Sequence, residues 1–140
     1  MLGGKPAPAC GFAMGVERVL ELLRASEPAL DDAQCDVYVV HQGEGVLPAA
    51  LDAAERLRDA GLDVVLHCGG GGFKAQFKRA DASGAFAAVV MGEDEVAAGQ
   101  ATVKWLRAEG GERGAGEQRR VALAELAGTI VDAMVDDDEQ

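Results

Sequence analysis

The stretch DVYVVH at residues 36–41 decides the fold, because it is the first of three apolar runs that share one rhythm. Its four apolar residues are consecutive, as in a strand that is buried on both faces of a sheet. The runs DVVLH at 63–67 and AFAAVVM at 85–91 repeat the pattern, and a helical segment separates each run from the next. This order forms two βαβ units, which imply parallel strands joined by right-handed crossovers.

The two helical segments are recognised by their ends and by the spacing of their apolar residues. The first begins near Pro48, a residue favoured in the first turn of a helix, and ends at Gly61. The second ends at Gly84. The inward-facing residues are Leu47, Leu51, Ala54 and Leu57 or Arg58 in the first helix, and Phe73, Phe77 and Ala80 in the second.

The rhythm changes after residue 91. The segment 101–106 has the pattern of a strand, but the connection before it is too short for another crossover, so it should pair antiparallel. A glycine-rich loop at 110–116 leads to a short strand at 118–121. The sequence therefore predicts an α/β fold, with a mixed, mostly parallel sheet flanked by helices on both faces. A final amphipathic helix is indicated by Leu123, Leu126, Ala127, Ile130, Val131 and Met134.

The residues before 36 follow a different plan. Residues 2–24 have the pattern of a glycine-rich loop and a short strand that runs into a helix, and turn-forming residues then interrupt the pattern at 25–34. The helix is indicated by Val16, Val19, Leu20 and Leu23, and the interruption by Ser26, Pro28, Asp31 and Asp32. The predicted organisation is a strand–helix unit at 1–25, a linker at 26–35, the α/β domain at 36–135 and an acidic tail at 136–140.

Composition excludes several classes of protein. Apolar residues make up 49% of the chain, but no run approaches the roughly 18 apolar residues of a membrane helix. The first residues lack the charged-then-apolar order of a signal peptide, so a soluble cytoplasmic protein that does not bind membranes is expected. Cys10, Cys35 and Cys68 are odd in number and far apart, which predicts free thiols.

The net charge of −11 argues against binding to nucleic acids, because contacts with phosphate need Lys and Arg. The distribution of charge weakens this objection. Five of the negative charges lie in the last nine residues, where a solvated tail is expected, and residues 73–107 carry a net charge of +1. A local basic surface is therefore compatible with the sequence.

The glycine run at 69–72 follows a strand and precedes a helix, where backbone amides and the helix dipole can bind an anion. A Walker loop would need Gly-Lys-Ser/Thr, and a dinucleotide-binding loop would need glycine in place of Lys74. The run is therefore either a phosphate-binding loop or a flexible entry to the helix. His41 and His67 each end a strand and have no further ligands at metal-binding spacing, so no metal site is expected.

The segment CGFAMGVERVL at residues 10–20 is far more specific. It resembles the third signature motif of class II aminoacyl-tRNA synthetases, and GFAMG followed by a small apolar residue and Glu-Arg is similar to the histidyl-tRNA synthetases. The preceding Leu-Gly-Gly at 2–4 is also typical of that family. The resemblance implies that Gly15 and Arg18 bind ATP, with Arg18 making a forked contact to phosphate. An ordinary salt bridge of Arg18 at the helix start is the alternative.

A second block resembles the anticodon-binding domain shared by histidyl, threonyl, prolyl and glycyl synthetases. It consists of GGFKAQFKRAD at 71–81, GA at 84–85, GEDEVAAG at 92–99 and VKWLR at 103–107, and the likeness spans residues 36–134. The resemblance implies that Gln76, Glu95 and Lys104 contact RNA bases or phosphates and form one exposed surface. Lys74, Lys78 and Arg79 face away from the apolar side of their helix and are expected to contact the RNA backbone.

The resemblance implies a parent enzyme that joins histidine to its tRNA with ATP and Mg²⁺, and that acts as a homodimer. Residues 1–25 would be the end of its catalytic domain. The first and second signature motifs and the histidine-recognition loops are missing from the 140 residues. We therefore expect a piece of a longer enzyme that has no catalytic residue or cofactor of its own and is inactive alone. Its partner would be histidine tRNA and not DNA.

Two rival functions remain open. The chain could be a stand-alone anticodon-domain protein that binds RNA or regulates without catalysis. It could also be a small flavodoxin-like domain that binds a nucleotide at the glycines of 69–72. Tight binding of a nucleotide by the isolated chain would be required for the second reading.

Overall fold

The computed structural model describes residues 10–26, 35–107 and 116–138. The chain divides into two units, residues 1–33 and 34–140, which are taken one at a time below. The Leu-Gly-Gly at 2–4, nearly all of the predicted linker and most of the loop predicted at 110–116 lie outside the described residues.

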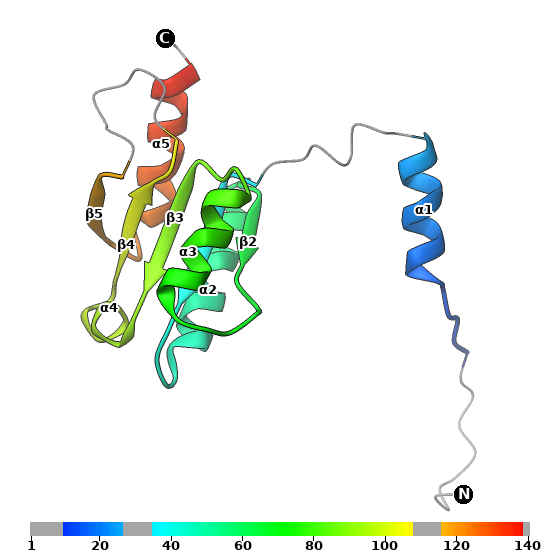
Figure 1. Ribbon diagram of the computed structural model, residues 1–140, viewed down its shortest axis with the longest axis horizontal. Coiled ribbons are helices and arrows are strands. Elements are labelled where there is room, and N and C mark those ends of the chain that lie inside the picture. The colour runs from blue at the N-terminus through cyan, green and yellow to red at the C-terminus, as the bar shows by residue number, and fades with distance from the viewer. Residues whose placement is uncertain (1–9, 27–34, 108–115, 139–140) are drawn as a thin grey trace, which may run out of the picture. The chain divides into compact units, whose positions relative to one another are not determined.

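The described part of the first unit is a short extended segment followed by helix α1, Val16–Ser26 (Figure 1). The predicted helix is thus present; the strand predicted before it falls partly on residues 2–9, which lie outside the described residues, and residues 10–15 have no strand structure. A strand needs a neighbour for its backbone hydrogen bonds, and the described residues of this unit offer none. The apolar side of α1 is open, with Val16 58% exposed and Leu20 46% exposed.

The second unit is built on a five-stranded sheet of order β2-β1-β3-β4-β5. The first three strands are parallel, while β4 pairs antiparallel with both β3 and β5, as the sequence predicts. The strands are β1 Val37–His41, β2 Val64–Leu66, β3 Ala87–Met91, β4 Gln100–Trp105 and β5 Gln118–Ala122.

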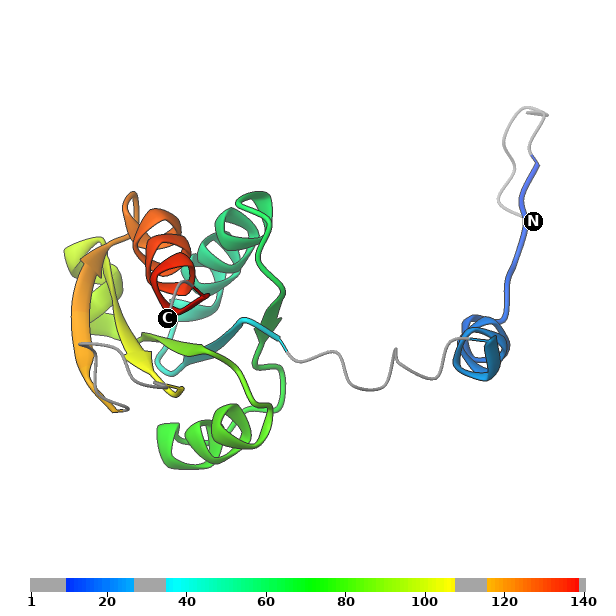
Figure 2. The ribbon, with the colours of Figure 1, turned by 90° about the horizontal axis from the view of Figure 1, so that it is seen from above.

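Helices cover both faces of this sheet. Helices α2 (Val46–Asp59) and α5 (Leu126–Asp138) lie on one face, and α3 (Phe73–Ala82) lies on the other (Figure 2). Two details differ from the prediction. A short helix, α4 (Glu93–Ala98), follows β3, and the last helix begins at Leu126 and continues through Asp138 into the predicted acidic tail.

The core has two parts because side chains alternate across the central strands. Val37 and Val39 of β1 pack against α2 and α5, together with inward-facing residues of β4 such as Val103. Tyr38 and Val40 pack on the opposite face with the apolar side of α3. Helix α3 lies over β1, so no helix among the described residues of this unit lies above the half of this face formed by β4 and β5.

The outer edge of β2 is covered by side chains. Asp63 and His67 bond to β1, so Val64 and Leu66 direct their backbone groups away from the sheet. The Arg58 guanidinium donates to the Val64 carbonyl at 2.8 Å, and the Cys68 thiol donates to the Leu66 carbonyl at 3.3 Å. Both outward carbonyls of this edge strand are therefore occupied.

Candidate nucleic-acid interface

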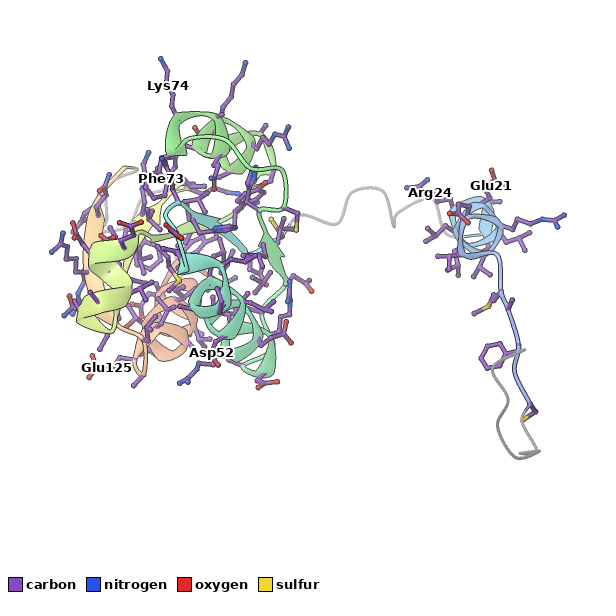
Figure 3. The ribbon with its side chains drawn as sticks, turned by 90° about the horizontal axis from the view of Figure 1, so that it is seen from below. Glu21, Arg24, Asp52, Phe73, Lys74 and Glu125 are labelled. Atoms are coloured by element: carbon purple, nitrogen blue, oxygen red, sulfur yellow. The ribbon has the colours of Figure 1, made fainter. Side chains whose placement is uncertain are left out.

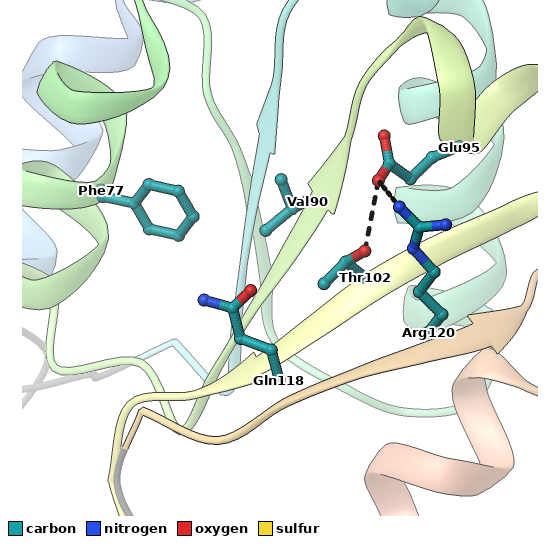
Figure 4. A pocket seen from close by; sticks show the side chains of 6 residues that line it. All are labelled: Phe77, Val90, Glu95, Thr102, Gln118 and Arg120. Carbon is teal, nitrogen blue, oxygen red and sulfur yellow. Dashed lines mark hydrogen bonds and ion pairs between the residues drawn. The ribbon is translucent and has the colours of Figure 1, made fainter.

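A groove of about 380 Å³ lies on the open half of the sheet, beside α3 (Figure 4). Two neighbouring rows of side chains form its floor. Val90, Thr102 and Arg120 align across β3, β4 and β5, and Lys104 aligns with Gln118 in the next row. The residues that line the groove are Phe77, Val90, Glu95, Thr102, Gln118 and Arg120.

Glu95 is held in place at one end of the groove. One carboxylate oxygen accepts the Gly92 backbone N–H at 3.1 Å, and the other accepts the Thr102 hydroxyl at 3.3 Å. Arg120 lies 3.9 Å from the second oxygen, and its side chain is 69% exposed against 17% for Glu95. The groove thus offers a fixed hydrogen-bond acceptor, Glu95, beside a more exposed donor, Arg120. Such a pair can bond to the polar edge of a planar ring.

Lys104 lies beside the aromatic wall of the same groove. Its ammonium nitrogen is 4.9 Å from the centre of the Phe77 ring, an attractive arrangement of a cation over an aromatic face. The structure therefore brings Glu95 and Lys104, two of the three residues that the resemblance assigns to RNA contacts, to one surface.

Gln76 does not belong to this surface, and the expectation that it is exposed there is wrong. Its side chain is 1% exposed. The side-chain oxygen accepts the His41 N–H at 2.9 Å, while the nitrogen donates to the carbonyls of His41 at 2.7 Å and Gly71 at 2.9 Å. The reason is visible in the sequence: Gln76 follows Phe73 by three residues and precedes Ala80 by four, so it shares their inward side.

Lys74, Lys78 and Arg79 are exposed, as expected for residues that face away from the apolar side of α3. Lys74 points away from the body of the domain (Figure 3). The Arg79 guanidinium lies against the glycine loop, since a Cβ added to Gly69 would come within 2.8 Å of it. None of these three cations lines the groove.

The glycine loop at 69–72 is anchored from below. The His67 ring nitrogen Nε2 faces the Gly70 carbonyl at 2.9 Å and must carry the proton, so Nδ1 accepts the Tyr38 hydroxyl at 2.9 Å. Gln76 holds the next carbonyl, of Gly71. The carbonyls of Gly70 and Gly71 therefore bond to side chains of the protein. The loop is held in place at the start of α3, instead of being the flexible entry that the sequence suggested.

The buried Tyr38 gives this network a measurable signature. Burial raises its pKa above the ordinary value of 10.0, although the Arg79 charge opposes this effect. The pKa of Tyr38 is therefore higher in the folded state than in the unfolded chain. The contribution of Tyr38 to the free energy of unfolding is complete below about pH 10, and it is lost as the pH rises through the folded-state pKa. Tyr38 is the single tyrosine of the chain, so ultraviolet absorbance reports it directly. We expect a midpoint above 10 in the native protein and near 10 in urea; equal midpoints would contradict the buried environment.

Gly15 and Arg18 belong to the first unit and are not part of the groove. Arg18 is exposed in the first turn of α1. Its side chain lies beside Gly15, the residue before the helix, and a Cβ added to Gly15 would be 3.6 Å from it. A guanidinium at a helix start is available to a phosphate there.

Besides Val90, which was predicted only as part of a buried strand, four lining residues were not singled out from the sequence: Phe77, Thr102, Gln118 and Arg120. Phe77 was assigned to the interior because it repeats at helical spacing with Phe73. The alternation of side chains along a strand could have identified the other three. Thr102 and Lys104 alternate with buried residues of β4, and Gln118 and Arg120 are their partners on β5.

Among the described residues, no three His, Cys, Asp or Glu side chains gather closely enough to hold a metal ion. In the same part of the chain, every helix is too short or too polar to cross a membrane.

Comparison with known proteins gives a consistent result. A histidine–tRNA ligase of Cupriavidus necator is 56% identical over 138 residues, which are 96% of this chain and 30% of that protein. The histidyl-tRNA synthetase of a Nostoc species superposes with a TM-score of 0.64 at 30% identity, over 86% of this chain and 28% of the other. The Staphylococcus aureus histidyl-tRNA synthetase gives 0.60 at 25% identity, over 82% and 28%.

The chain thus spans about 30% of the length of the curated relatives it matches. The family described as "Anticodon binding domain" matches residues 34–133, which include every element from β1 to the middle of α5. This range contains all the residues that line the groove. The chain belongs to the anticodon-binding domain family.

Proposed function

We propose that this chain is the anticodon-binding part of a histidine–tRNA ligase and that the groove beside α3 binds the anticodon loop of histidine tRNA. The observation that carries the proposal is the groove itself: a fixed carboxylate, an exposed guanidinium and an amide surround a recess with one aromatic wall. Single-stranded RNA loops are read through the polar edges and flat faces of their unpaired bases, which these groups match.

The proposed roles follow from position. Glu95 accepts a hydrogen bond from a base edge, because its carboxylate is held toward the groove by Gly92 and Thr102. Lys104 contacts a phosphate or a base carbonyl from the next row of the floor. Lys74, Lys78 and Arg79 are exposed on α3 and attract the RNA backbone, which adds affinity without sequence preference. Gln76 acts indirectly, by fixing α3.

The whole ligase would activate histidine with ATP and Mg²⁺, transfer it to the tRNA and act as a homodimer in the cytoplasm. In that enzyme Arg18 and Gly15 would contact ATP. Binding the anticodon far from the reacting atoms positions the acceptor end, so that remote binding energy assists the chemistry.

The test is an isosteric change at Glu95. In Glu95→Gln the remaining side-chain oxygen can still accept the Gly92 N–H, but the charge is lost. Charge-assisted hydrogen bonds contribute about 1.5–3 kcal/mol, so affinity for the histidine-tRNA anticodon stem–loop should fall about ten-fold or more. Fluorescence anisotropy with this RNA, and with RNAs altered at each anticodon base, measures both affinity and discrimination.

The matched control is Glu125→Gln, which removes the same charge from the turn before α5, on the side of the domain opposite Lys74 (Figure 3). This variant should bind every RNA slightly more tightly, since a repulsive charge is gone. If Glu95→Gln behaves like the control and binds all the RNAs better, Glu95 does not read a base.

A further inference from the structure

We propose that the Phe77 ring is the stacking surface for one unpaired anticodon base, and that the polar side chains around it meet the edge of that base. This inference rests on the proposed function above. In this arrangement the Phe77 ring provides affinity for the base. Glu95, Gln118 and Arg120 distinguish one base from another.

The surroundings of Phe77 distinguish it from an ordinary core residue. It packs with the α3-side core on one side, where Phe73 lies 6.3 Å away at a tilt of 41°. On the other side it lines the groove, where the remaining wall and floor residues are polar except for Val90. The ring therefore presents an apolar surface to a recess whose opposite wall is charged (Figure 4).

This combination fits a nucleobase better than other ligands. A base has two apolar faces and a polar edge, so one face can lie on an aromatic ring while the edge meets donors and acceptors. The groove offers an acceptor in Glu95, a donor in Arg120 and an amide with both capacities in Gln118. A free phosphate would leave the ring without a use and would be repelled by the carboxylate.

The ring is also held before any RNA arrives. Gln76, the residue before Phe77, ties α3 to the end of β1 and to the glycine loop through three hydrogen bonds. The Gln42 side chain adds another tie, because its oxygen accepts the Phe73 N–H at 3.0 Å. A helix fixed at its first turn holds the ring in one place, which reduces the ordering cost of binding.

Lys104 completes the arrangement. Its ammonium lies over the ring, 4.9 Å from the centre, so a base that stacks on this face takes its place and moves it to the side. The phosphate that follows or precedes such a base would come within reach of this cation. Stacking on Phe77 and an ionic contact with Lys104 would then act on the same nucleotide.

The experiment uses the anticodon stem–loop of histidine tRNA with 2-aminopurine in place of one anticodon base at a time. Stacking on an aromatic ring quenches this probe, so one position should lose fluorescence when the chain binds. In Phe77→Leu this loss should disappear, and affinity should fall about five- to 100-fold for the native and the base-altered stem–loops alike. Phe77→Tyr should retain both the quenching and the affinity.

Phe73→Leu is the matched control, because it removes the neighbouring ring of α3 without changing the lining of the groove. It should retain the quenching. If Phe77→Leu keeps quenching and affinity while Glu95→Gln still loses discrimination, the stacking role is wrong and the proposed function stands. If the unaltered chain binds none of the stem–loops, both proposals are overturned.

Discussion

Replacing Gln76 with Leu should lower the free energy of unfolding by about 3 kcal/mol or more, since each buried polar group left without a partner costs about 1–3 kcal/mol. The change removes three hydrogen bonds and leaves the His41 N–H and two backbone carbonyls unpaired. Small domains have only about 5–15 kcal/mol of stability, so the loss would be large.

Urea denaturation of the chain, followed by the fluorescence of the buried Trp105, measures this loss. Gln118→Leu is the control, because the same chemical change occurs on an exposed residue of β5 and should alter stability by less than about 0.5 kcal/mol. Equal midpoints for the two variants would show that the Gln76 amide contributes nothing to the fold.

Replacing Arg18 with Ala in the complete ligase should slow adenylate formation ten-fold or more. A charge-assisted contact to phosphate contributes about 1.5–3 kcal/mol, and a guanidinium can make two such bonds at once. Pyrophosphate exchange measures the step. Arg18→Lys keeps the charge but loses the forked geometry, and it should fall between wild type and Arg18→Ala. Unchanged exchange in Arg18→Ala would assign Arg18 a structural role in α1.

The sheet could be predicted from the sequence because its strands carry strong local signals. The run at 36–41 is apolar at four consecutive positions, and the glycines and turns between runs mark the connections. Helix α4 was missed because six residues between Gly92 and Gly99 are too few to show a helical period.

The candidate site was predictable only in part. Glu95 and Lys104 were located by resemblance, and the structure places both at the groove. The resemblance gives a role to each position, but it does not show which way a side chain points. For this reason Gln76 was expected at the surface. Phe77 shows the opposite error. Helical spacing places a residue on the apolar side of its helix, but it does not show where the helix stops covering the sheet.

The covered edge of β2 limits how molecules of this chain can associate. A sheet grows into a fibre when each molecule offers two free edges, so that every copy pairs with one before it and one after it. Here Arg58 and Cys68 occupy the outward carbonyls of β2. A strand added at the β2 edge would have to displace both of these contacts, so growth of the sheet in this direction is opposed.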